Sequence, residues 1–352
     1  MTAPNEPTFR DRAAAPIPLA SDAPALVTGA SGFVGGLLAR RLLAAGRRVR
    51  AVARSPLAEL KRLGAETMRA DIADPAAMDR ACRGVGTVFH AAARVGVWGP
   101  REAFERTNIG GAQAILAACR RQGAARLVFT SSPSVVFDDA DLAGVDESHP
   151  RGRNFPADYP RTKAEAERLI LEAHEPARLA TCALRPHLIW GVGDQNLIPR
   201  VVARARAGRL RIVGTGTNRV DLTHVENVVD AHILAERALA AADAAAGGRP
   251  YFITNGEPVI LWDWINDLLA RLGIAQVRRR ISLPAARRIG ACCETAWRIL
   301  RLRGEPPMTR FVASELAKDH WFCIDAARRD LGYAPRVSMD RGLDDLVASL
   351  RR

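Results

Sequence analysis

Short apolar segments alternate with amphipathic stretches along much of the chain. Residues 25–28 form an apolar run that leads through a glycine-rich turn into a pattern over 37–43, where leucines recur at helical spacing. Further strand-like runs follow at 49–53, immediately before 70, at 85–93, at 126–132, at 183–191 and at 252–253. Strands that alternate with helices predict an α/β fold, here a Rossmann-type doubly wound parallel sheet.

The alternation loosens after the segment that ends near residue 191, which divides the chain into predicted regions. Residues 260–352 have a mainly helical and irregular pattern, typical of a smaller substrate-binding cap. We expect a flexible leader at 1–23, a dinucleotide-binding Rossmann core at 24–187 to which 225–254 return, and a cap formed by 188–224 and 255–352. The leader has no continuous apolar stretch that could serve as the core of a signal peptide.

The glycine-rich turn after the first strand carries the first candidate site. Gly29, Gly32 and Gly35 stand between a strand and a helix, where glycines allow a tight turn and a close approach of the backbone to a pyrophosphate. The N-terminus of the following helix would stabilise the phosphate charge. We therefore expect these glycines, with Ser31 and Phe33 between them, to bind a dinucleotide.

The ends of the next strands predict which dinucleotide binds. Arg54 follows the second strand, where an arginine suits the 2′-phosphate of NADP and an acid would suit the ribose of NAD. This favours NADPH and leaves NADH as the alternative. Asp71 and Ile72 follow the third strand, and the Asp71 carboxylate could face the adenine or simply cap a helix. The small residues Ala91 and Ala92 end the fourth strand and allow a cofactor to lie against the backbone.

Tyr159 and Lys163 form the strongest candidate for acid–base chemistry. Lys163 is one of only three lysines in a chain that takes its positive charge from arginine. A helix would place the two side chains on one face, where an ammonium lowers the pKa of a phenol and prepares it for proton transfer. The spacing alone also fits a surface tyrosine beside a solvated lysine.

The composition narrows the classes of partner. A net charge of +13 permits anionic partners, but aromatic residues make up only 5% of the chain and no nucleic-acid-binding motif is present, so we expect no nucleic-acid role. The six cysteines have no metal-binding spacing, which predicts reduced thiols, no metal site and a cytoplasmic location. No window approaches the roughly 18 apolar residues of a membrane span, so we expect membrane contact to be peripheral at most.

Several motifs, taken in order, resemble one enzyme superfamily. They are the glycine turn, Asp71-Ile72, the run from His90 to Ala93, the run from Thr107 to Gly111, Ser131-Ser132, Tyr159-x-x-x-Lys163 and Leu184-Arg185-Pro186. Together they resemble the extended short-chain dehydrogenase/reductase superfamily, and within it the 3β-hydroxysteroid dehydrogenase-like branch. Further stretches, at 132–135, 184–191, 204–211, 255–258 and 304–307, are similar to the bacterial 2-alkyl-3-oxoalkanoate reductases of olefin biosynthesis.

The resemblance implies roles for individual residues. Tyr159 is the expected general acid, which protonates a substrate ketone, and Lys163 lowers its pKa and holds the nicotinamide ribose. Ser132 is expected to hydrogen-bond the carbonyl, with Ser131 as its rival. Asn108 supports the proton relay by kinking a helix, and Arg185 is expected among the cofactor-binding residues. A departure from the pattern is His90, where many relatives carry asparagine.

The resemblance also implies a substrate. We expect NADPH-dependent reduction of the 3-keto group of a long-chain 2-alkyl-3-oxoalkanoate in olefin biosynthesis, by a protein that could form a homodimer or assemble with other enzymes of that pathway. An NAD-dependent sterol or 3β-hydroxysteroid dehydrogenase, a sugar-nucleotide epimerase and a non-catalytic dinucleotide-binding scaffold in a lipid-processing complex are the alternatives. The basic amphipathic stretch 281–303 fits either a membrane or partner surface, or a cap helix with an arginine-covered outer face.

Overall fold

A seven-stranded sheet forms the centre of the protein. The computed structural model describes residues 17, 19, 23–241 and 245–351, so the predicted leader lies almost entirely outside the described residues. The strands follow the order β12 (Pro250–Ile253), β7 (Ala180–Pro186), β5 (Arg126–Thr130), β4 (Thr87–His90), β1 (Ala25–Thr28), β2 (Val49–Ala53) and β3 (Glu66–Arg69). Neighbouring strands are parallel throughout, which confirms the predicted fold class.

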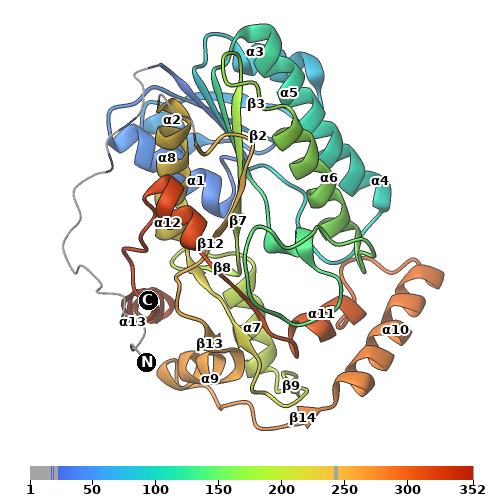
Figure 1. Ribbon diagram of the computed structural model, residues 1–352. Coiled ribbons are helices and arrows are strands. Elements are labelled where there is room, and N and C mark those ends of the chain that lie inside the picture. Colours follow the sequence, from blue (N-terminus) through green and yellow to red (C-terminus); the bar gives the residue numbers. More distant parts are fainter. Residues whose placement is uncertain (1–16, 18, 20–22, 242–244, 352) are drawn as a thin grey trace.

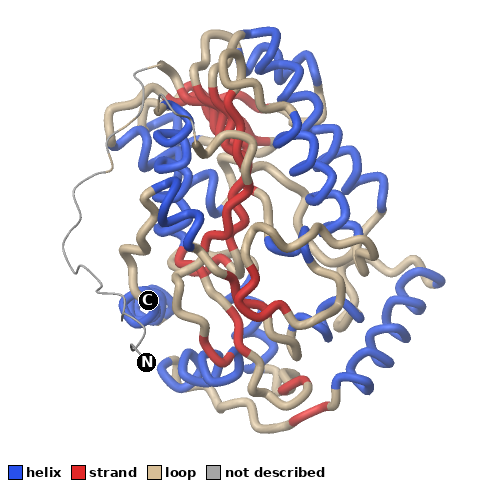
Figure 2. Tube along the Cα trace, viewed as in Figure 1, coloured by secondary structure: helices blue, strands red, loops and turns tan. Residues whose placement is uncertain are grey.

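Helices cover both faces of this sheet, as Figures 1 and 2 show. One face is covered by α1 (Phe33–Ala44), α8 (Val225–Ala240) and α12 (Asp325–Leu331), with the short α2 (Ala58–Arg62) beside α1. The other face is covered by α3 (Pro75–Cys82), α5 (Gly111–Gln122) and α6 (Asp158–Glu172). The apolar side of each helix packs against the valine- and leucine-rich strands, so the sheet is buried on both faces, as a parallel sheet requires.

The strand order places a crevice at the middle of the sheet. The chain runs outward from β1 through β2 to β3 and then crosses to β4 on the opposite side of β1. The loops that follow β1 and β4 therefore leave the sheet in different directions. Ligands of open α/β sheets bind at such a reversal, beyond the carboxyl ends of the strands.

A second apolar core lies beyond these carboxyl ends and forms the cap. It contains Trp190, Trp262, Leu268 and Leu343, which are buried. Its elements are β8 (Ile189–Trp190), α7 (Leu197–Arg206), β9 (Ile212–Val213), β10 (Arg219–Val220), β11 (Thr223–His224), β13 (Val259–Ile260), α9 (Leu261–Arg271), β14 (Arg280–Ile281), α10 (Leu283–Ile299), α11 (Arg310–Glu315), β15 (His320–Phe322) and α13 (Met339–Leu350). No helix of the described residues is long and apolar enough to cross a bilayer.

Two elements cross between the predicted core and cap. Strand β6 (Leu142–Val145), from the predicted core range, pairs with β15 in a four-stranded sheet of order β13-β10-β15-β6. Helix α12, from the predicted cap range, packs on α8 and β12. The core and the cap are thus joined by β6 and α12, each of which packs with the other region. The predicted residue ranges of core and cap stay a prediction.

Candidate active site

A cavity of about 980 Å³ lies at the carboxyl edge of the sheet, between the core and the cap. Most of the predicted site residues line it, although they come from distant parts of the chain. They are Gly29, Ser31, Gly32, Phe33, Gly35, Arg54, Asp71, Ile72, Ala91, Ala92, Ser131, Ser132, Tyr159 and Lys163. Asn108 and Arg185 are not among the lining residues.

The glycine turn has the geometry of a dinucleotide cradle. Gly29 has φ of +68°, and a Cβ atom there would lie 2.8 Å from the backbone of Ala92, so a larger residue would not fit. A Cβ on Gly35 would collide with the carbonyl oxygen of Gly29. No side chain caps the start of α1 at Gly32, which leaves the N-terminal N–H groups of this helix free for an anion. The residues present therefore fit a pyrophosphate group.

Two arginines line the cavity beyond β2 and β3. Arg54 is exposed and forms no ion pair with a described residue. The backbone carbonyl of Arg54 accepts a hydrogen bond from Arg69 Nε at 2.9 Å. Arg69 was not among the predicted residues, although it ends β3 as Arg54 follows β2. Two guanidinium groups at this edge make it suitable for a phosphate.

Asp71 is already engaged by its protein neighbours. Its carboxylate accepts hydrogen bonds from the backbone N–H of Ala73 at 3.0 Å and from Arg106 Nη1 at 2.7 Å. Burial alone would raise the pKa of Asp71, but these two donors hold it below its usual value. The carboxylate therefore stays ionised at the cavity wall, where it both closes a turn and remains available as an acceptor.

Tyr159 and Lys163 lie one turn apart at the start of α6, and both line the cavity. Lys163 Nζ donates to the carbonyl oxygen of Thr130 at 2.6 Å and lies 4.0 Å from the centre of the Phe129 ring. Burial lowers the pKa of Lys163 to about 7, although the Glu167 carboxylate opposes this shift. The Lys163 amino group is thus held against the end of β5.

The pKa of Tyr159 differs from our expectation. Burial raises it above the usual value near 10, a shift that a hydrogen bond with Ser132 opposes. We expected Lys163 to lower this pKa, but the Lys163 ammonium is directed to the Thr130 carbonyl instead. In this state Tyr159 is a neutral phenol, which is the form that donates a proton.

The two candidate serines have different partners. Ser131 is buried and its hydroxyl donates to Glu167 Oε2 at 2.6 Å. Ser132 is partly exposed to the cavity and accepts from the backbone N–H of Ser134 at 3.2 Å and from its hydroxyl at 3.0 Å. The Ser132 hydroxyl has no buried carboxylate acceptor, and besides Ser134 its partner is Tyr159, which also lines the cavity, so the geometry favours Ser132 over its neighbour.

Asn108 lies behind the cavity wall, in a π-helical segment η1 (Glu105–Gly110) between α4 (Arg101–Phe104) and α5. Its Nδ2 donates to Thr162 Oγ1 at 2.9 Å, and its Oδ1 accepts from the backbone N–H of Arg94 at 2.8 Å. The widened turn brings the Asn108 side chain between α6 and the loop after β4. Asn108 thus fixes the helix that carries Tyr159 rather than contacting the cavity itself.

The structure places Arg185 outside the lining of the cavity. Arg185 is buried, and it donates from Nε and Nη2 to the two oxygens of Glu167 at 2.9 and 2.6 Å. This pair lies beneath Ser131 and Lys163 because Glu167 follows Lys163 by one helical turn. Glu167 was missed by the sequence analysis, although its i+4 spacing continues the face that carries Tyr159 and Lys163.

Neither histidine near the site is free for catalysis. His90 is buried, with Nδ1 2.9 Å from the hydroxyl oxygen of Thr28, and burial lowers its pKa to about 3. His187 is buried with Nε2 2.6 Å from Nδ1 of His320. Both rings are held by protein partners, which makes them structural in this state.

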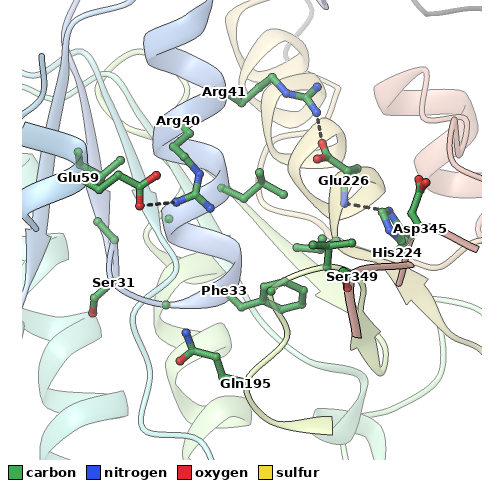
Figure 3. Close-up of a pocket in the computed structure, with 18 of the residues that line it drawn as sticks. Ser31, Phe33, Arg40, Arg41, Glu59, Gln195, His224, Glu226, Asp345 and Ser349 are labelled. Atoms are coloured by element: carbon green, nitrogen blue, oxygen red, sulfur yellow. Dashed lines mark hydrogen bonds and ion pairs between the residues drawn. The ribbon is translucent and has the colours of Figure 1, made fainter. Parts of the chain in front are cut away.

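A second cavity, of about 1160 Å³, lies on the other side of α1 and shares Ser31 and Phe33 with the first. Figure 3 shows that charged side chains pair around it: Arg40 with Glu59 at 3.5 Å, and Arg41 with Glu226. None of Tyr159, Lys163 and Ser132 lines this larger cavity. The smaller cavity is therefore the candidate active site.

Comparisons with known proteins identify the family of the chain. The profile of the 3-beta hydroxysteroid dehydrogenase/isomerase family matches residues 26–285. A 2-alkyl-3-oxoalkanoate reductase from Stenotrophomonas maltophilia is 49% identical over 92% of this chain and 98% of its own length, and one from Shewanella oneidensis is 42% identical over 93% and 86%.

Solved structures show the same architecture. MoeE5 in complex with UDP-glucose and NAD matches with a TM-score of 0.69 and 27% identity, over 93% of this chain and 98% of that chain. The cavity of the present protein lies where a nicotinamide dinucleotide is expected in such a fold. The chain belongs to the 3-beta hydroxysteroid dehydrogenase/isomerase family, within the extended short-chain dehydrogenase/reductase superfamily, and is an NAD(P)-dependent oxidoreductase.

Proposed function

We propose that this protein reduces the 3-keto group of a long-chain 2-alkyl-3-oxoalkanoate to the 2-alkyl-3-hydroxyalkanoate, with NADPH, in olefin biosynthesis. The observation that carries the proposal is that Tyr159, Lys163 and Ser132 line one cavity together with the glycine cradle. The identity of 49% to a reductase named for this substrate, over nearly the whole chain, supports the choice of substrate.

The chain's own residues account for the proton in this reaction. The cofactor, when bound, supplies the hydride that C3 of the ketone accepts. Tyr159, a phenol in this state, donates its proton to the carbonyl oxygen, and the Ser132 hydroxyl donates a hydrogen bond to the same oxygen as negative charge develops. Lys163, one turn away on α6, is directed to the Thr130 carbonyl in this state, and it would stabilise the remaining tyrosinate when its ammonium turns toward Tyr159. The net change is addition of one hydride and one proton to the carbonyl group.

The preference for NADPH rests on the edge of the cavity beyond β2 and β3. Arg54 and Arg69 both line this edge, and the charge of Arg54 acts on the nearby Asp71 carboxylate without forming a close ion pair with any described residue. Guanidinium groups bind a phosphate with paired, charge-assisted hydrogen bonds, whereas NAD has only a ribose hydroxyl there. An arginine at this position thus favours binding of NADP over NAD.

The decisive measurement is loss of the reduced-nicotinamide absorbance when the purified protein meets a synthetic long-chain 2-alkyl-3-oxo acid, with NADPH and NADH in parallel. We expect faster oxidation of NADPH, and an Arg54→Asp variant that turns over the same acid with NADH preferred. The variant Tyr159→Phe should lose turnover by a factor of about 10² or more while still binding the cofactor.

Three outcomes would contradict the proposal. Undiminished ketone reduction by Tyr159→Phe would remove the assigned acid. Oxidation of a 3β-hydroxysteroid with NAD, without turnover of the oxo acid, would identify a steroid dehydrogenase. Cofactor binding without turnover of either substrate would identify a dinucleotide-binding scaffold. An unchanged NADPH preference in Arg54→Asp would contradict only the assignment of the 2′-phosphate site.

A further inference from the structure

The cap carries an arm that projects from the body of the protein. The arm consists of α10 and the turn that follows it, residues 283–303. In Figure 1 it is the orange helix at the lower right, next to the red α11, which is its principal packing partner. Elsewhere the arm contacts Asp139 through Arg287 and the Trp98 ring through Arg298, while Arg288, Ile289 and residues 298–303 are exposed.

The arm is held to α11 by one narrow face. Ala286, Gly290 and Glu294, spaced four residues apart, are its buried residues. A Cβ atom on Gly290 would lie 2.7 Å from the backbone of Arg310, so the two helices are in close contact. Glu294 accepts hydrogen bonds from the backbone N–H of Arg310 at 2.7 Å and from its Nε at 2.8 Å. The only carboxylate of the arm is thereby turned inward and neutralised.

The open side of the arm displays large apolar side chains. Of the nine exposed large hydrophobic residues described, four belong to the arm: Ile289 (48% exposed), Ile299 (73%), Leu300 (64%) and Leu302 (43%). The turn that carries the last three is ordered, because the N–H of Leu302 donates to the carbonyl of Trp297 at 3.1 Å, with Arg301 at φ of +49°. This is a Schellman cap, which fixes the leucines at the tip rather than leaving a frayed end.

Arginines surround these apolar residues. Arg288, Arg301 and Arg303 form no ion pair with any described residue, and Arg298 has as its neighbour the ring of Trp98, 5.7 Å from the guanidinium carbon. Glu294, the one acidic residue of the arm, is buried and paired with Arg310, and Arg287 pairs with Asp139, so the charges that the exposed arm residues carry are all positive. Its charge is complementary to an anionic surface.

The arm lies beside the candidate active site. Glu305, two residues beyond the arm, accepts from Arg200 Nη1 at 2.7 Å and from the backbone N–H of Val97 at 3.4 Å. Arg200 and Gly96 line the active-site cavity, as does Val95, a residue that is 58% exposed. Glu305, three residues after Leu302, therefore fixes the segment that follows the apolar tip to the cavity wall.

We propose that the arm docks on an anionic membrane surface. Ile299, Leu300 and Leu302 would enter the boundary between headgroups and acyl chains, and the surrounding arginines would contact lipid phosphates. The use of this docking rests on the proposed function: a substrate with two long alkyl chains partitions into a bilayer, and the docked arm brings the cavity to that source. The docking itself depends only on the surface of the arm.

The test is co-sedimentation of the full-length protein with vesicles of phosphatidylcholine alone or of an equal mixture of phosphatidylcholine and phosphatidylglycerol. We expect binding to the anionic vesicles, weaker binding at high salt, and little binding to phosphatidylcholine. The triple variant Ile299→Ser, Leu300→Ser, Leu302→Ser should bind the anionic vesicles at least about tenfold more weakly. The pair Arg301→Gln, Arg303→Gln should lose about fivefold per arginine, with the apolar contacts retained.

A matched control replaces exposed apolar residues elsewhere: Leu63→Ser, Ile260→Ser should bind vesicles as the parent protein does. Reduction of a short-chain, water-soluble 2-alkyl-3-oxo acid should be unchanged in all arm variants, which also reports that they are folded. Equal vesicle binding by the triple variant and the parent would overturn the proposal. So would a shift from dimer to monomer on mutation without any vesicle binding, since the arm would then join two copies of the chain. Vesicle binding without turnover of any oxo acid would leave the docking intact and remove the proposed function.

Discussion

Ser131 and Ser132 stand side by side at the end of β5, and their hydrogen bonds separate their roles. The Ser131 proton is committed to the buried Glu167 carboxylate, whereas Ser132 accepts from Ser134 and has as its other partner Tyr159, which lines the cavity. A hydroxyl that has already donated its proton to a carboxylate cannot also donate to a substrate carbonyl. The chemistry of the site therefore depends on which of two identical side chains has a protein acceptor.

This difference leads to a prediction. Ser132→Ala should lower kcat for ketone reduction by about 10²-fold, because one donor to the developing oxyanion is lost. Ser131→Ala should keep most of the activity and instead lower the free energy of unfolding by about 1 kcal/mol, since Glu167 loses a donor. Steady-state kinetics and urea unfolding of both variants test the assignment. The reverse order of activities would assign the carbonyl contact to Ser131.

Helix α6 carries several residues of the site on one face. Tyr159, Lys163 and Glu167 follow one another at intervals of four residues, so the acid, the ammonium and the buried carboxylate form a continuous line along the helix. Glu167 reaches Arg185 on β7, and Asn108 reaches Thr162 from the π-helical segment. The helix is thus fixed to the sheet through Arg185 and to the π-helical segment through Asn108.

The Glu167–Arg185 pair is expected to matter more for stability than surface pairs of the same helix. Glu167→Gln should lower the free energy of unfolding by about 3 kcal/mol or more, because the buried Arg185 guanidinium loses its counter-charge. Glu165 is the matched control on the same helix: it pairs with Arg168 with both side chains more than a third exposed, and Glu165→Gln should lose less than about 1 kcal/mol. Similar losses in chemical denaturation for the two variants would contradict the structural role given to Glu167.

The sequence predicted the local parts of this arrangement well. The glycine turn, the strand ends and the Tyr159–Lys163 pair depend on spacings of a few residues, which a strand or helix converts directly into geometry. The position of Arg185 depended instead on a partner in another element: the motif suggests a cofactor contact, but the Glu167 carboxylate holds the guanidinium below the cavity floor. A one-dimensional pattern does not show which buried charge an arginine will find.

The sheet and its connections to the cap show the same difference between local contacts and contacts distant in sequence. The alternation of strands and helices predicted the parallel sheet, because each βα unit is set by nearby residues. The pairing of β6 with β15 joins segments about 180 residues apart, and the packing of α12 on α8 returns the chain to the core after the cap has formed. These contacts depend on how the core packs against the cap, so no local sequence pattern indicates them.

Buried histidines predict how the whole molecule responds to acid. Burial lowers the pKa of His90 to about 3 and of His232 and His224 to about 4, so each stays neutral in the folded state. In the unfolded chain the same groups take up a proton as the pH falls below about 6.5. Since the unfolded state then binds more protons, each lowered pKa contributes stability that is fully present above pH 6.5 and is lost progressively as the pH falls toward the folded pKa.

The loss between pH 6.5 and 5 should reach about 2 kcal/mol for each such histidine, which is large against the usual stability of a domain. Buried carboxyl groups act in the opposite direction, as burial raises the pKa of Asp221 to about 7, so the test compares two proteins rather than two pH values alone. His90→Asn can keep a hydrogen bond to Thr28 while removing one titrating ring. Its free energy of unfolding, measured in urea at both pH values, should fall by about 2 kcal/mol less than that of the parent protein. Parallel losses would show that His90 does not remain neutral in the folded state, and that the acid sensitivity of the molecule arises elsewhere.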